Sequence, residues 1–156
     1  MLDNVVADRD FAKIMKSSII DLIVHFFQKE QNFGILCNIE DASFEPTLPE
    51  NINSNFRQLT LFFLAGYTFE TARIDGEYLV FEAGFGEENF GSVVTVPLLS
   101  IMQIIVDETP VFINLSTFKD TQAKDQDEVK EKIDESGVKN SMASFLSNPE
   151  NSKFLK

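Results

Sequence analysis

Few side chains in this chain could carry covalent chemistry. Among its 156 residues, His25 is the single histidine and Cys37 the single cysteine. A thiol and an imidazole can act together as nucleophile and base, but nothing in the neighbouring sequence supports that pairing. One histidine and one cysteine also fall short of the usual ligand set of a zinc site. We therefore expect no catalytic set, no metal and no cofactor, and we predict that the protein is not an enzyme.

Two acidic pairs are the remaining candidates for chemistry. Glu87 and Glu88 lie in the stretch AGFGEENFG, where they could serve as a general acid and base or bind a cation. The simpler interpretation is a solvated hairpin tip. The glycines of this stretch do not form a phosphate-binding loop, because no Gly-Lys-Ser/Thr and no helix start follow them. Asp107 and Glu108 are predicted, by the same logic, to form the polar end of a helix.

The charge and the composition favour a soluble domain with no nucleic-acid or membrane partner. The net charge is −12, and most of it lies in residues 1–118. Nucleic acids and anionic membranes are polyanions, which such a surface repels. A single cysteine excludes an intramolecular disulfide, and residues 1–10 lack the basic start and apolar run of a signal peptide. No apolar stretch is long enough to cross a bilayer, so we expect a cytoplasmic protein.

A long helix is predicted near the N-terminus. Asp8 or Asp10 can cap its start, and it should run to about Gln31, with Gly34 beyond its end. Its apolar residues recur at steps of three or four and include Phe11, Met15, Ile19, Leu22 and Phe26. The apolar arc is wider than one core contact requires. The extra width can face a second subunit or lie under a later loop or the tail.

Short strands dominate the rest of the body. The expected strands cover residues 35–39, 59–64, 68–74, 78–85, 92–96 and 110–115. Asp75-Gly76 between two of them is a strong hairpin signal. Residues 41–55 are predicted to be a loop, and Pro97 is predicted to start a short helix over residues 98–106. These elements predict an α+β fold, with the N-terminal helix packed on a small, strongly curled antiparallel sheet or barrel.

The last part of the chain differs from the body in composition. Residues 119–152 are polar without a sustained apolar period, and they precede a short apolar and basic stub made of Lys153, Phe154, Leu155 and Lys156. One interpretation of the stub is a frayed terminus. The other is a docking tip at the end of a flexible linker. We accordingly divide the chain into a domain at 1–118, a linker at 119–152 and a docking stub at 153–156.

The segment at residues 78–115 resembles the stringent starvation protein B (SspB) family, whose members are adaptors of the ClpXP protease. The strand motif F-x-A-x-F-G-G of that family is matched by Phe81, Ala83, Phe85 and Gly86, and its V-x-V-P segment by Val94, Val96 and Pro97. Two positions depart from the pattern: Glu87 replaces the second glycine, and Gly84 replaces a larger residue. The polar linker and the terminal stub are similar to those of the family as well.

The resemblance implies a fold and a binding site. The fold would be a small Sm-like or SH3-like barrel that dimerises through its N-terminal helix. The tag-binding groove would run beside the strand that contains Ala83, where a small side chain leaves room for a peptide backbone. Phe81 and Phe85 share the strand parity of Ala83 and would either line the groove or belong to the core. Leu61 and Phe63 on the neighbouring strand are further groove candidates.

The resemblance also implies a function. The body would bind tagged polypeptides, such as those that carry the ssrA peptide, and Lys153–Lys156 would dock on the N-terminal domain of a ClpX-type unfoldase. A different class fits the composition as well: a small acidic, dimeric chaperone-like protein that holds a partner or a secretion substrate. That class does not require the stub. A ligand-binding or enzymatic barrel is a third class, but the sequence offers no convergent polar groups for it.

Overall fold

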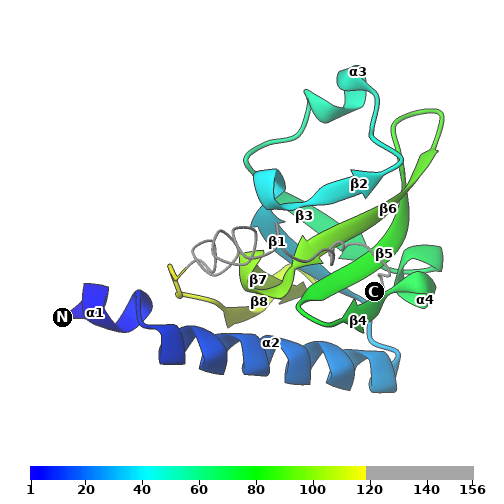
Figure 1. Cartoon of the computed structure of the whole chain (residues 1–156). Helices are drawn as coiled ribbons and strands as arrows, with labels where there is room; N and C mark the ends of the chain where they lie inside the picture. The colour runs from blue at the N-terminus through cyan, green and yellow to red at the C-terminus, as the bar shows by residue number, and fades with distance from the viewer. Residues whose placement is uncertain (119–156) are drawn as a thin grey trace, which may run out of the picture. The chain divides into compact units, whose positions relative to one another are not determined.

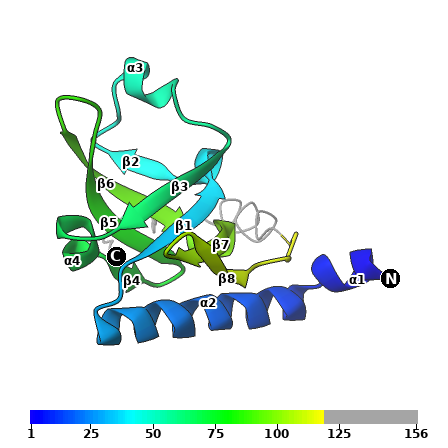
Figure 2. The same ribbon diagram turned by 180° about the vertical axis from the view of Figure 1, so that it is seen from behind.

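A long helix lies along one side of a β-rich body in residues 1–118, the part of the chain that the computed structural model describes (Figure 1, Figure 2). This helix, α2, spans Arg9–Lys29 and follows a short helix, α1, at Leu2–Val6. No helix within the described part is both long and apolar enough to cross a membrane. The linker and the docking stub predicted at 119–152 and 153–156 lie outside the described residues.

The ends of α2 follow from the residues that flank it. Asp8 has an extended backbone, and its carboxylate accepts the N–H of Phe11 at 2.8 Å, which makes it the N-cap. Glu30 ends the helix in a left-handed conformation with a φ of 56°. The predicted helix is thus confirmed, but Gly34 is not its terminator, because that glycine lies inside the first strand. The residues that α2 buries are Ala12, Ile19 and Ile23.

Two four-stranded antiparallel sheets make up the rest of the body. Sheet A has the order β3-β1-β7-β8, with β3 at Leu59–Leu64, β1 at Phe33–Asn38, β7 at Ile101–Val106 and β8 at Thr109–Ile113. Sheet B has the order β2-β6-β5-β4, with β2 at Ser43–Glu45, β6 at Phe90–Pro97, β5 at Tyr78–Phe85 and β4 at Arg73–Asp75. The α+β class is confirmed. The strands are divided between two sheets, neither of which closes on itself, so the expected single curled sheet or barrel does not describe their pairing.

The strand predicted at 68–74 is wrong for most of its length. A short helix, α4 at Tyr67–Thr71, takes its place, and the paired strand is limited to the three residues of β4. The reason lies in the core: Phe69 makes edge-on ring contacts with Phe27 at 5.8 Å and with Phe33 at 6.3 Å. Tertiary packing of one aromatic side chain therefore overrides the local β propensity.

The helix predicted after Pro97 is also wrong. Leu98–Ser100 form a single 3₁₀ turn, and β7 begins at Ile101. The apolar spacing misleads because the register between β1 and β7 shifts at a bulge. The bulge leaves Ile101 and Ile104 both buried although they are three residues apart, a spacing that resembles a helix.

Tight turns join neighbouring strands in both sheets. Asp107 and Glu108, which were expected to end a helix, form the two-residue turn between β7 and β8, with φ values of 50° and 70° that are typical of a type I′ hairpin. The hairpin predicted at Asp75-Gly76 is confirmed, because Asp75 pairs with Tyr78 across a glycine with a φ of 60°. The segment predicted as a loop also contains β2 and a short helix, α3, at Glu50–Asn53.

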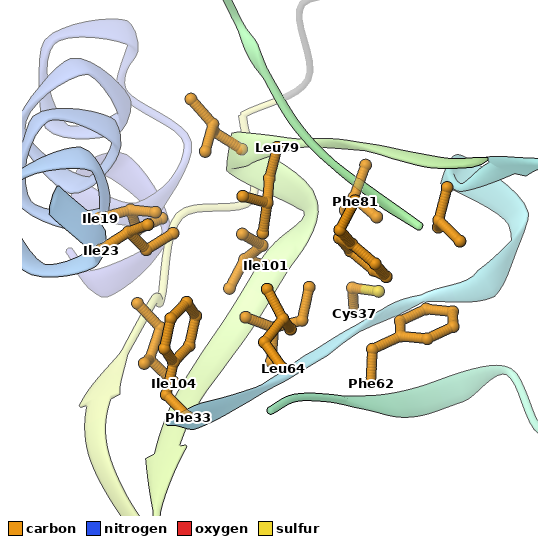
Figure 3. Packing of buried hydrophobic residues seen from close by; sticks show 14 residues of the cluster. Ile19, Ile23, Phe33, Cys37, Phe62, Leu64, Leu79, Phe81, Ile101 and Ile104 are labelled. Carbon is orange, nitrogen blue, oxygen red and sulfur yellow. The ribbon is translucent and has the colours of Figure 1, made fainter. Parts of the chain in front are cut away.

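The hydrophobic core lies between α2 and one face of each sheet, which we call the inward face (Figure 3). Its fully buried side chains include Ile19 and Ile23 of α2, Phe33, Ile35, Leu64 and Ile104 of sheet A, and Leu79, Phe81, Val94 and Val96 of sheet B. Successive side chains of a strand point to opposite faces. The residues between the buried ones therefore point away from the core, on the outward face of each sheet.

Candidate peptide-binding site

The histidine and the cysteine are not arranged for catalysis. His25 is exposed on α2 beside the ring of Phe26, whereas Cys37 is fully buried in the core (Figure 3). Burial, with a smaller contribution from the charge of Asp41, raises the pKa of Cys37 to about 12. A thiol with this pKa stays protonated near neutral pH and is a poor nucleophile. Within residues 1–118, no group of three or more His, Cys, Asp or Glu side chains could hold a metal ion.

The acidic pair of the glycine-rich stretch lies at the tip of the β5–β6 hairpin, in agreement with the sequence-based interpretation. Glu87 and Glu88 are both exposed. The loop is closed by the N–H of Asn89, which donates to the carbonyl of Gly86 at 3.1 Å. These carboxylates face solvent, and they do not converge with any other acidic side chain among the described residues.

Ala83 lies in the second half of β5, on its inward face. It stands opposite Ser92 of β6 and has the same strand parity as Phe81 and Phe85. The alanine is half-buried and packs against the hydrophobic core. Ser92 donates its hydroxyl to the carbonyl of Pro46 at 2.9 Å, so the polar side chain beside Ala83 already has a partner.

A cluster of phenylalanine rings gathers around this part of the inward face. Phe85 makes edge-on contacts with Phe44 at 5.6 Å and with Phe56 at 5.9 Å, and Phe44 and Phe56 stack on each other at 5.8 Å. Phe62 of β3 lies 5.6 Å from Phe81 and 6.3 Å from Phe85. The ring of Phe62 thus links β3 of sheet A to β5 of sheet B. Phe81 is fully buried and belongs to the core, whereas Phe85 is half-buried.

Both strands that share this cluster have an unpaired edge. β3 is the edge strand of sheet A. On β5, pairing with β4 ends at Val80, and the N–H of Glu82 donates to Thr71 Oγ1 at 2.9 Å. Alternate residues of an antiparallel strand direct their backbone groups to the same side. The N–H and C=O of Gly84 therefore also point away from β6, and no other described strand pairs with them. We call the edge of β3, the edge of β5 at Ala83–Phe85 and the phenylalanine cluster that links the two strands the seam.

Helix α4 marks one end of the seam at Glu82. Tyr67 donates its hydroxyl to the Glu82 carboxylate at 2.5 Å, and this hydrogen bond, together with the negative charge of Glu82, raises the pKa of Tyr67. Thr71, at the other end of the same helix, accepts the Glu82 N–H. Because the backbone N–H and the side chain of Glu82 are already bonded, we expect a strand added to β5 to begin after it.

Gly84 has a local reason to lack a side chain. A Cβ built at this position would lie 1.8 Å from Oδ1 of Asn89, because the Asn89 amide lies across the outward face of β5. Gly84 replaces the larger residue of the family pattern, and the side chain of Asn89 occupies the space that a larger residue would need. It leaves a stretch of backbone on the seam that carries no side chain of its own.

The other predicted groove residues lie on the opposite face of β3. Leu61 and Phe63 are 53% and 63% exposed and alternate with the buried Phe62, so they do not join Ala83 on the inward face. Conversely, Phe44 and Phe56 belong to the site without having been expected there. Phe44 lies near the start of the segment predicted as a loop, Phe56 follows directly after its end, and no short-range spacing links them to β5.

The predicted docking residues Lys153, Phe154, Leu155 and Lys156 lie outside the described residues. Comparisons of the chain with protein-family models, with curated proteins and with solved structures found no match. The assignment of the site consequently rests on the strand edges, the aromatic cluster and the short motifs around Ala83.

Proposed function

We propose that this protein binds extended peptides as a non-enzymatic adaptor for proteolysis. The position of Ala83 carries the proposal. The residue that matches the family motif lies on an unpaired stretch of β5, next to the phenylalanine cluster and within the seam. Unpaired strand edges bind extended peptides through main-chain hydrogen bonds, and the neighbouring surface selects alternate side chains.

A bound peptide would enter the seam as an added strand. Its backbone would exchange hydrogen bonds with the N–H and C=O of Gly84 on one side and with the edge of β3 on the other. Every second side chain of the peptide would point inward, toward Phe62 and Phe85. Ala83 itself contributes only a methyl group to the inward face, so β5 leaves more room for the peptide here than a larger side chain would.

The proposal includes the tethering mechanism of the family. Tagged polypeptides, with the ssrA-type peptide as the first candidate, would be held at the seam, and Lys153–Lys156 would dock on the N-terminal domain of a ClpX-type unfoldase. Because one chain would hold both the tagged polypeptide and the unfoldase, the effective concentration of the polypeptide near the unfoldase would be high. Deletion of residues 153–156 should abolish delivery and leave peptide binding unchanged. A truncated protein that still accelerates degradation would contradict the docking role.

The proposal also extends to the fold and the location that the resemblance implies. The two sheets would correspond to an Sm-like or SH3-like barrel, and the protein would act in the cytoplasm. The resemblance also implies a homodimer held by the N-terminal helix, but the surface of α2 does not favour that contact. On α2, the exposed apolar residues are Ile14 and Val24. Exposed Lys13 and Asp21 lie among them, so a contact through this helix would join apolar and charged side chains.

Fluorescence anisotropy of a labelled ssrA-type peptide tests the proposal. We expect saturable binding by the wild type and an affinity about tenfold or more lower for Ala83→Gln, because the longer side chain fills the seam and brings an amide without a partner into it. Thr95→Gln is the matched control, since Thr95 lies on the outward face of the adjacent β6. Absence of binding by the wild type, or equal affinity of the two variants, would contradict the proposal.

A chaperone-like function is the second candidate, and the exposed apolar side chains of β3 favour it. Leu59, Leu61 and Phe63 are 45%, 53% and 63% exposed. A holding protein of this kind would bind apolar segments of many sequences, and its binding would not depend on Ala83. Binding that is specific for the tag and sensitive to Ala83→Gln therefore separates the adaptor from the chaperone-like protein.

A further inference from the structure

The four strands of sheet A contain no charged residue. Their sequences are FGILCN in β1, LTLFFL in β3, IMQIIV in β7 and TPVFI in β8. The chain as a whole is strongly charged, with 24% Asp, Glu, Lys and Arg and a net charge of −12. Strands that are buried on both faces are nearly continuous apolar runs, whereas strands with one face in water alternate apolar and polar residues. The strands of sheet A are of the first kind.

Within residues 1–118, however, only the inward face of sheet A is covered. Its outward face carries the apolar residues Leu36, Leu59, Leu61, Phe63, Ile105 and Ile113 together with the uncharged polar residues Asn38 and Gln103, and we call this surface the neutral face. Phe63 is 63% exposed at one edge of the sheet, and Ile113 is 54% exposed at the other. A largely apolar surface without charges that extends across a whole sheet is typical of a contact site.

The neutral face is most open at Gly34, on the central strand β1. Leu36 of β1 stands opposite Leu61 of β3, and Gly34 stands between Phe63 and Ile105. The side chains of Leu61 and Phe63 lean over the glycine: a Cβ built on Gly34 would lie 3.1 Å from Cδ1 of Leu61 and 3.7 Å from Cδ1 of Phe63. The small residue lets these side chains lie close to the sheet, which favours contact with another flat surface.

We propose that a second copy of this chain covers the neutral face. Two copies with a charge of −12 each repel one another at most mutual contacts. A two-fold symmetric contact places a surface against itself, so a face without charges brings no like charges together. The face also spans all four strands of the sheet, a width of roughly 14–19 Å. One helix is only about 10 Å across, whereas an opposing sheet of the same kind matches the full width.

The area of the neutral face limits the affinity of the proposed dimer. The strand spacing and the length of β3 give a projected area of roughly 400 Å², whereas specific, stable interfaces bury about 800 Å² on each partner. We therefore expect a weak dimer that forms as the protein concentration rises. Salt should strengthen it, because salt screens the repulsion between two anionic copies and leaves the apolar contact in place. This inference does not rest on peptide binding at the seam.

Sedimentation velocity of the full chain over a range of protein concentrations, at low and high salt, tests the proposal. Phe63→Lys places a charge on the neutral face, Thr95→Lys places the same charge on the outward face of sheet B, and Ile14→Lys places it on α2. We expect Phe63→Lys to raise the dissociation constant of the dimer about tenfold or more. The wild type and the two other variants should associate alike, and more strongly at high salt.

The outcomes distinguish this proposal from the others. Ile113→Lys, at the far edge of the sheet, repeats the test if circular dichroism shows that Phe63→Lys fails to fold. A wild type that stays monomeric at every concentration overturns the proposal, and so does association that is lost in Ile14→Lys but kept in Phe63→Lys and Ile113→Lys. Peptide binding reports separately on the proposed function, because it depends on Ala83→Gln and not on these variants.

Discussion

Sheets A and B have the same number of strands and enclose the same core, but their outward faces differ in charge. Sheet B carries Glu45 on β2, Arg73 and Asp75 on β4 and Glu82 on β5, all at positions that point away from the core. The strands of sheet A carry no charge on either face. Sheet B is built as a sheet with one face in water, and sheet A as one that is covered on both sides.

Exposure in a single copy does not distinguish the two outward faces, because sheet A also has exposed side chains. The presence or absence of charged residues does distinguish them, and it indicates which face stays in water. Phe63 on sheet A is more exposed than Leu59 or Leu61 on the same strand. Burial of an exposed phenylalanine or leucine stabilises by about 1.5–3 kcal/mol when it is complete. A sheet face with several such side chains therefore favours a partner, whereas the charged face of sheet B favours water.

The largest expected effect separates the inward and outward faces within one copy. Phe81→Ala should lower the free energy of unfolding by about 3–5 kcal/mol, because the ring is fully buried and its removal leaves a cavity. Phe63→Ala should lower it by less than about 1 kcal/mol at dilute protein concentration, since that ring already lies mostly in water. Urea denaturation of both variants measures the difference. Equal losses of unfolding free energy in the two variants would contradict the assignment of Phe81 to a buried face and Phe63 to an exposed face.

A smaller effect concerns the inward face of sheet A, where Cys37 should be shielded from water. Burial raises the pKa of its thiol from 9.0 to about 12, so the folded state favours the protonated form. The stability that depends on this shift is fully present below pH 9.0 and is lost as the pH rises toward 12. Urea midpoints measured across this range should fall more steeply for the wild type than for Cys37→Ala. Parallel pH profiles would mean that the thiol is not shielded.

Much of the fold could be predicted from local sequence, because local signals specify it. The start of α2 near Asp8 or Asp10, the bounds of β3 and β5 and the hairpin at Asp75-Gly76 all follow from residues that are close together in the sequence. Long-range effects caused the errors. The bulge in β7 gave a strand helical spacing, and the contacts of Phe69 turned an expected strand into α4.

The candidate site was predicted only where it coincides with a motif. Ala83 and Phe85 could be named from the sequence, but Phe44, Phe56 and Phe62 reach them only through the packing of the two sheets. The uncharged strands can be seen in the sequence, yet their assembly into one sheet cannot. β1 lies between β3 and β7, and that order follows from long-range pairing.

The most direct test of the account compares one variant from each surface in the same two assays. Ala83→Gln and Phe63→Lys are each titrated against the labelled ssrA-type peptide and each examined by sedimentation velocity. We expect Ala83→Gln to lose peptide binding and keep self-association, and Phe63→Lys to keep peptide binding and lose self-association. Wild-type protein that does not bind the peptide, or variants that lose both properties together while remaining folded, would contradict the assignment of two separate surfaces.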